Sequence, residues 1–174
     1  MFDDVVKKYS EALYDVAETE GDDMLEDLRM VGEAYENREL RGALSHPDLG
    51  AEEKHAIVEN LFRGRVSDFV TNFLLICVDN RRSDLVPYIV KDYEDLYYER
   101  RGIERITVVT PIELEEEKLR AIARAYKGDD AVEVRQRIDE SLIGGVQIET
   151  DTGIIDRSIA RQLEDMARVL RHHP

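Results

Sequence analysis

The residue types that most often carry out enzyme chemistry are few in this chain and lie apart from one another. The histidines are His46, His55 and the adjacent pair His172 and His173. None of them has the spacing of a zinc motif such as H-E-x-x-H, in which two histidines share one helix face. The single cysteine, Cys77, lies in an apolar segment without the basic or histidine neighbour that turns a thiol into a nucleophile. The sequence predicts neither a catalytic centre nor a metal site from these residues.

Two other patterns could bind a cofactor, but both are better explained as features of the local backbone structure. Gly144 and Gly145 lack the G-x-G-x-x-G spacing of a dinucleotide site, and a strand rather than a helix is expected after them. No G-x-x-x-x-G-K-[ST] phosphate loop occurs. The glutamates between Glu113 and Glu117 are expected in the first turn of a helix, where carboxylates complement the helix dipole. We therefore expect no cofactor and no metal ion.

Length and charge narrow the functional classes. The chain has 174 residues, of which 43% are hydrophobic, so it can form a packed core. Its net charge of −15 disfavours binding to nucleic acid and to anionic lipid. Residues 1–4 do not begin a signal peptide, and the longest apolar run, 73–78, is too short to cross a bilayer. We expect a soluble, cytosolic protein with no membrane insertion and no small-molecule substrate.

The first hundred residues show apolar positions at helical spacing, interrupted by short turns. We expect Gly21 to end the first helix and Ser83 to be the N-cap of the sixth. Five of the expected helices span about 3–20, 22–35, 50–63, 66–80 and 83–101. A short third helix is expected to carry Leu40 and Leu44 and to end before Pro47. Short connections favour antiparallel neighbours in a compact bundle.

After Gly102 the apolar period changes from 3.6 to 2, which indicates strands. We expect strands at 103–110, 132–138 and 145–150, further extended residues at 154–155, and a helix at 113–127. Asp156 or Ser158 is expected to cap a last helix. The predicted fold class is α+β and mainly α: a six-helix N-terminal bundle at 1–102, followed by a small α/β C-terminal domain at 103–174.

The first and fifth expected helices are apolar around an unusually large part of their circumference. On the first helix, the row Val5, Tyr9, Ala12 and Val16 lies beside the row Val6, Leu13 and Ala17. On the fifth, Leu75, Ile76 and Val78 widen the stripe that Phe69, Phe73 and Cys77 begin. Such helices are either central to their bundle or have a second face for a partner. Both interpretations remain open from composition alone.

A signature near the end of the chain resembles that of the delta subunit of bacterial F-type ATP synthase, whose mitochondrial counterpart is the oligomycin-sensitivity-conferring protein. It reads IDESLIGGVQI at 138–148 and IIDRSI at 154–159. Three shorter segments also resemble this family: KYSEALY at 8–14, NRRSDL at 80–85 and TVVTPI at 107–112. Among the departures, Ser10 and Thr110 replace alanines that are usual in the family.

The resemblance implies a non-catalytic stator subunit that links the catalytic head to the peripheral stalk and resists rotor torque during proton-driven ATP synthesis. It implies that the N-terminal bundle binds an N-terminal helix of an alpha subunit between its first and fifth helices, at Tyr9, Ala12, Asn72 and Ile76. It also implies that the C-terminal domain binds the stalk's b subunits. The location would be the cytoplasmic side of the bacterial membrane, held there peripherally by the complex. The alternatives are a helical adaptor unrelated to ATP synthase and, with no assembled pocket to support it, an enzyme.

Overall fold

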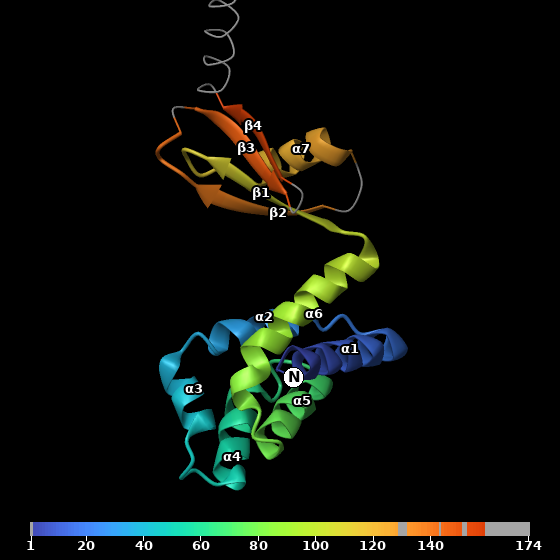
Figure 1. Cartoon of the computed structure of the whole chain (residues 1–174), viewed down its shortest axis with the longest axis vertical. Coiled ribbons are helices and arrows are strands. Elements are labelled where there is room, and N and C mark those ends of the chain that lie inside the picture. The colour runs from blue at the N-terminus through green and yellow to red at the C-terminus, as the bar shows by residue number, and fades with distance from the viewer. Residues whose placement is uncertain (1, 129–131, 143, 151–152, 159–174) are drawn as a thin grey trace, which may run out of the picture. The chain divides into compact units, whose positions relative to one another are not determined.

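The computed structural model describes residues 2–128, 132–142, 144–150 and 153–158. The chain divides into two compact units, one reaching to Tyr97 and the other beginning at Tyr98. This division falls inside a helix, a few residues before the change of period near Gly102. Figure 1 shows the elements of each unit.

The first unit is helical. Its helices in the described part of the chain are α1 (Phe2–Glu20), α2 (Leu25–Ala34), α3 (Arg38–Ser45), α4 (Ala51–Phe62), α5 (Asp68–Asp79) and α6 (Val86–Arg101). Local chemistry fixes several ends. Gly21 has φ +68°, the left-handed conformation that ends α1 at little cost for glycine. The Asn37 side chain accepts hydrogen bonds from the first turn of α3, and Ser67 accepts one from Val70 N–H at the start of α5.

The start of the sixth helix differs from the expectation. Ser83 is not an N-cap, because it opens a short 3-10 turn, Ser83–Leu85, that precedes α6. The reason is Pro87, which has no N–H to donate to the Ser83 carbonyl four residues earlier. Val86 N–H bonds to that carbonyl instead, with the three-residue spacing of a 3-10 helix.

Apolar side chains from every helix of the first unit form its core. The largest side chains that are fully buried there belong to Met24, Leu28, Val31, Tyr35, Leu44, Val58, Val70, Leu74, Val86, Ile89 and Tyr93. Polar ties join distant segments around this core. Tyr97 Oη donates to Asp23 at 2.7 Å, and Arg29 pairs with Glu94 at 2.8 Å, so α6 is tied to α2 and the turn before it.

In its described residues, the second unit is a four-stranded mixed sheet with one helix packed on it (Figure 1). Its elements are β1 (Glu104–Thr110), α7 (Glu116–Lys127), β2 (Val132–Ile138), β3 (Gly145–Thr150) and β4 (Gly153–Ser158). The strand order is β2-β1-β3-β4, and only β1 and β2 are parallel. A parallel pair needs a crossover, which α7 provides. Ile106, Val108, Ala123 and Ile148 form the buried centre between α7 and the sheet. The predicted fold class, α+β and mainly α, is confirmed.

Two local expectations in this unit were wrong. The helix begins at Glu116 rather than Glu113, because the Gln136 side chain holds the preceding loop extended. It accepts a hydrogen bond from Leu114 N–H at 3.2 Å and donates to the Ile112 carbonyl at 3.0 Å. Of the two residues expected to cap the last helix, Asp156 does not do so, since it lies inside β4 opposite Gln147, and Ser158 is the last residue of that strand. The last helix expected after Ser158 lies outside the described residues.

Candidate partner-binding surface

Two rows of side chains divide α1 into an inner and an outer face. The inner face is buried and consists of Val6, Ser10, Leu13, Tyr14 and Ala17. On the outer face, Val5 and Tyr9 are half-buried, Ala12 is exposed, and Val16 is 38% exposed. The packing of the bundle therefore uses only one of the two apolar rows that make this helix unusually broad.

Helix α5 is divided in the same way. Its buried side chains are Val70, Thr71, Phe73, Leu74, Cys77 and Val78. Phe69 is 40% exposed and Ile76 50% exposed, and Asn72 between them is also exposed. Two large apolar side chains at such exposures, two helical turns apart on one face, leave apolar surface in water that the bundle itself does not cover.

Tyr9 joins the two helices, which lie side by side in Figure 1. Its ring meets that of Phe73 edge-on, with 6.2 Å between the ring centroids. Its hydroxyl accepts hydrogen bonds from Asn80 Nδ2 at 3.3 Å and from Arg82 Nη1 at 3.1 Å. The guanidinium carbon of Arg82 lies 5.6 Å from the ring centroid, within cation–π distance. These contacts hold the side chain of Tyr9, which belongs to α1, against the end of α5.

We call this exposed surface the apolar strip. It consists of Val5, Tyr9, Ala12 and Val16 on α1 and of Phe69, Asn72 and Ile76 on α5. All four residues that the sequence singled out belong to it. Three of them, Ala12, Asn72 and Ile76, are exposed, and Tyr9 is half-buried. The protein's own described side chains leave this surface open rather than burying it.

Sequence reasoning missed the residues that hold the strip in place. Asn80 and Arg82 position the Tyr9 hydroxyl, although neither lies on α1 or is close to it in sequence. The signal was present, since both belong to the NRRSDL segment on which the family resemblance partly depends. Val16 and Phe69 were recognised as apolar, but no pattern indicated that they would be exposed.

The titratable side chains near the strip do not form a reactive site. Burial raises the pKa of Cys77 to about 12, so its thiol is protonated at neutral pH. His55 Nε2 lies 2.8 Å from Asp79 Oδ1, an exposed pair that links α4 to α5. Within the described ranges, no cluster of three or more His, Cys, Asp or Glu side chains could hold a metal ion. In the same ranges, no helix is long and apolar enough to span a bilayer.

The described part of the C-terminal signature has a structural role. The hydroxyl and the N–H of Ser141 both bond to Asp139, which lowers the pKa of that carboxyl and shapes the turn after β2. Asp139 N–H bonds in turn to the Thr110 carbonyl at 2.9 Å, which ties this turn to the end of β1. These side chains stabilise the connection between strands.

Comparisons with known proteins agree with this architecture. The family described as ATP synthase delta (OSCP) subunit matches residues 5–170. ATP synthase subunit delta of Bacillus cereus (strain B4264) is 34% identical over 172 residues, which cover 95% of each chain. The same protein of Bacillus thuringiensis (strain Al Hakam) has the same identity and coverage.

A solved structure supports the fold. A chain in the cryo-EM structure of the Toxoplasma gondii mitochondrial ATP synthase hexamer superposes with a TM-score of 0.67 at 18% identity. The superposition covers 97% of this chain and 98% of that one. The predicted family is confirmed: this chain belongs to the ATP synthase delta (OSCP) subunit family and is a non-catalytic stator component of the F-type ATP synthase peripheral stalk.

Proposed function

We propose that the apolar strip binds an amphipathic helix at the N-terminus of an ATP synthase alpha subunit, and that the second unit binds the stalk's b subunits. The single observation that carries the proposed binding of the alpha subunit is the exposure of Phe69 and Ile76 on α5, the helix whose Phe73 ring meets Tyr9 of α1. Family membership sets aside the alternative of an adaptor unrelated to ATP synthase. In the cell, we expect the subunit on the cytoplasmic side of the membrane, held peripherally by the complex.

The strip has the features of a surface that receives a helix. Helices bind in grooves through apolar side chains spaced three or four residues apart, and the strip offers such surface from two neighbouring helices. Ala12 has the smallest side chain in the strip, so a partner helix can approach closely there. Asn72 is its one amide and can orient the partner by hydrogen bonding.

Charge around the strip indicates what else the partner helix should carry. Asp15 lies one turn beyond Ala12 on α1, and Asp68 lies one turn before Asn72 on α5; both are exposed. We therefore expect the bound helix to present lysines or arginines beside its apolar face. Such exposed pairs mainly set the orientation and the rate of association, so binding should weaken as salt is raised.

The decisive experiment measures binding of the full chain to a peptide from the N-terminus of the same organism's alpha subunit by titration calorimetry. Ala12→Asp should raise the Kd at least about tenfold, because binding would desolvate a carboxylate against apolar side chains. The matched control is Ala56→Asp, an exposed alanine in α4, which should leave the Kd unchanged. Equal binding by wild type and Ala12→Asp would refute the proposed site.

Stability must be measured in parallel. Because Ala12 is exposed, Ala12→Asp should leave the urea midpoint close to that of Ala56→Asp. A large loss of stability in Ala12→Asp alone would mean that the position belongs to the core.

The second unit has its own exposed apolar surface. Ile112 is 66% exposed and Ile138 is 52% exposed, and they lie at the same end of the sheet because Thr110 pairs with Ile138. We propose that this end contacts the b subunits. Ile138→Asp should reduce capture of the full chain by an immobilised C-terminal segment of the b subunit without changing its affinity for the alpha peptide. Loss of both interactions would indicate general misfolding and count against this assignment.

A further inference from the structure

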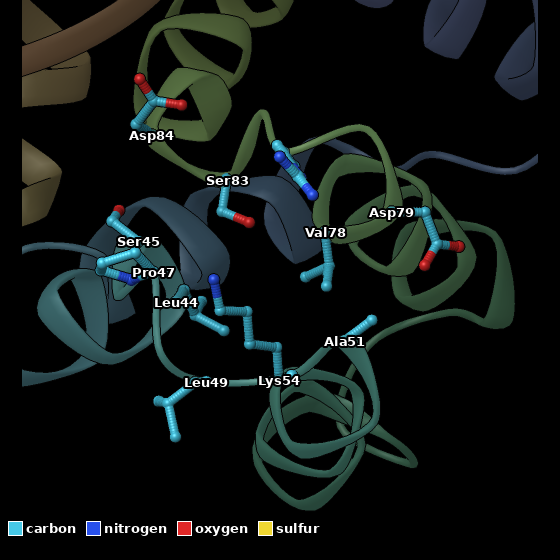
Figure 2. A pocket seen from close by; sticks show the side chains of 12 residues that line it. Leu44, Ser45, Pro47, Leu49, Ala51, Lys54, Val78, Asp79, Ser83 and Asp84 are labelled. Carbon is cyan, nitrogen blue, oxygen red and sulfur yellow. The ribbon is translucent and has the colours of Figure 1, made fainter.

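A cavity of about 690 Å³ lies among α3, α4, the end of α5 and the 3-10 turn (Figure 2). Pockets that hold small molecules typically measure about 300–1,000 Å³. The apolar part of the cavity wall includes Leu44, Leu49 and Val78. None of the lining residues belongs to the apolar strip, so the proposed helix partner leaves this cavity unexplained.

Two hydrogen-bond donors point into the cavity without a protein partner. The Lys54 side chain extends into it from α4, and the Ser83 hydroxyl faces it from the 3-10 turn (Figure 2). Ser83 is only 5% exposed, and its hydroxyl has no hydrogen-bond partner in the part of the chain that the structure describes. In the described ranges, the one buried side-chain polar atom without a partner is Tyr35 Oη. The Ser83 oxygen, which also lacks a partner, is therefore reached from the cavity and is available to a ligand.

The charges around the cavity favour an anion inside it. Lys54 is half-buried and, among the described residues, forms no ion pair, although the chain has 39 acidic and 24 basic residues. The carboxylates of Asp79 and Asp84 point away from the middle of the cavity (Figure 2). Asp79 is also engaged by His55 at 2.8 Å. Arg81 adds a second cation to the lining.

We propose that this cavity binds a small phosphate monoester. The phosphate accepts hydrogen bonds from Lys54 Nζ and Ser83 Oγ and is further stabilised by the charge of Arg81, while the carbon body lies against Leu44 and Val78. A phosphate fits better than a carboxylate because it offers more acceptor oxygens and more negative charge to three donor side chains. The site is independent of the proposed binding of the alpha subunit and of the b subunits.

Titration of the ¹⁵N-labelled full chain with propyl phosphate, inorganic phosphate and butyrate, followed by amide NMR shifts, tests this proposal. Propyl phosphate should saturate the shifts of Leu49, Lys54 and Ser83 and bind more tightly than either of the other two anions. Inorganic phosphate lacks the carbon body, and butyrate lacks the third oxygen. Shifts that stay linear in concentration, or equal affinity for butyrate, would overturn the proposal.

Variants separate a built site from general attraction to positive charge. Lys54→Gln should raise the Kd for propyl phosphate about tenfold, because it removes a charge-assisted hydrogen bond, and Ser83→Ala should raise it several-fold. Lys91→Gln removes an exposed lysine on α6 and should change the Kd less than twofold. Equal weakening by Lys91→Gln, or no weakening in both cavity variants, would show that no such site exists.

Discussion

The hydrogen bond between Ser10 and Asp92 gives the sharpest test of how α1 is held against α6. Ser10 is fully buried, and its hydroxyl donates to Asp92 Oδ2 and lies 3.0 Å from the Lys7 carbonyl. Ser10→Ala removes this donor and leaves a carboxylate facing the helix. A hydrogen bond to a charged group contributes about 1.5–3 kcal/mol. Because Asp92 is half-buried and water can replace part of the lost bond, we expect about 1.5 kcal/mol, the lower end.

Urea unfolding followed by tyrosine fluorescence measures this loss. The chain has no tryptophan, and six of its eight tyrosines lie in the first unit, so the signal reports mainly on the bundle. With a urea m-value of about 1.5 kcal/mol/M, the expected loss lowers the midpoint by about 1 M. Ser45→Ala, at the exposed end of α3, is the matched control and should change stability by less than about 0.5 kcal/mol.

A double-mutant cycle then assigns the loss to the contact itself. Ser10→Ala and Asp92→Ala, measured singly and together, should give a coupling energy of about 1 kcal/mol or more. A coupling energy near zero would refute the reasoning, since Ser10 would then stabilise the bundle only by filling space. Greater stability of Ser10→Ala than of wild type would refute it as well.

Three further predictions each concern one side chain and its surroundings. Cys77 should resist alkylation by iodoacetamide at pH 8 and react once urea unfolds the bundle. Its pKa of about 12, against a usual 9.0, lowers the fraction of thiolate roughly a thousandfold. Equal rates of alkylation in the folded and unfolded chain would contradict its burial. Tyr126→Phe should raise the pKa of Glu104, which the hydrogen bond from Tyr126 and the contact with Lys127 hold below its usual 4.5. Because folding lowers the pKa of Glu104, its contribution to stability is complete above about pH 5 and is lost as pH falls through the pKa of the folded state. A carboxyl-carbon NMR titration that gives Glu104 the same pKa in wild type and Tyr126→Phe would disprove the contact. Tyr9→Phe should lower stability by about 0.5–1.5 kcal/mol in urea unfolding by removing the acceptor for Asn80 and Arg82, and an unchanged midpoint would mean that these bonds add nothing.

Much of the fold could be predicted because local chemistry decides it. Gly21 ends α1 through its left-handed backbone, and the strand periods locate β1, β2 and β3. Two expected helix starts were wrong because another residue nearby in the structure prevented them. Pro87 converted the expected cap at Ser83 into a 3-10 turn, and Gln136 delayed the start of α7 by holding the loop before it.

The candidate strip was predictable only in part. The breadth of the apolar faces on α1 and α5 predicted that both helices would keep exposed apolar side chains, because a small bundle cannot bury every side of each of them. Which row would stay exposed depends on pairings between residues that are far apart in sequence. The bond from Arg82 to Tyr9 spans 73 residues, and no spacing rule connects two such positions. The strand order and the parallel pairing of β1 with β2 are long-range choices of the same kind.

The first helix finds its stabilising neighbours late in the chain. Phe73, Arg82 and Asp92 all contact α1, and the bond from Ser10 to Asp92 joins residues 82 positions apart. At about 5–20 residues per second, a ribosome takes roughly 4–16 s to synthesise that interval. During translation the amphipathic N-terminal segment therefore emerges before the residues that bury its inner face. Until those residues are made, its apolar inner face has no native partner.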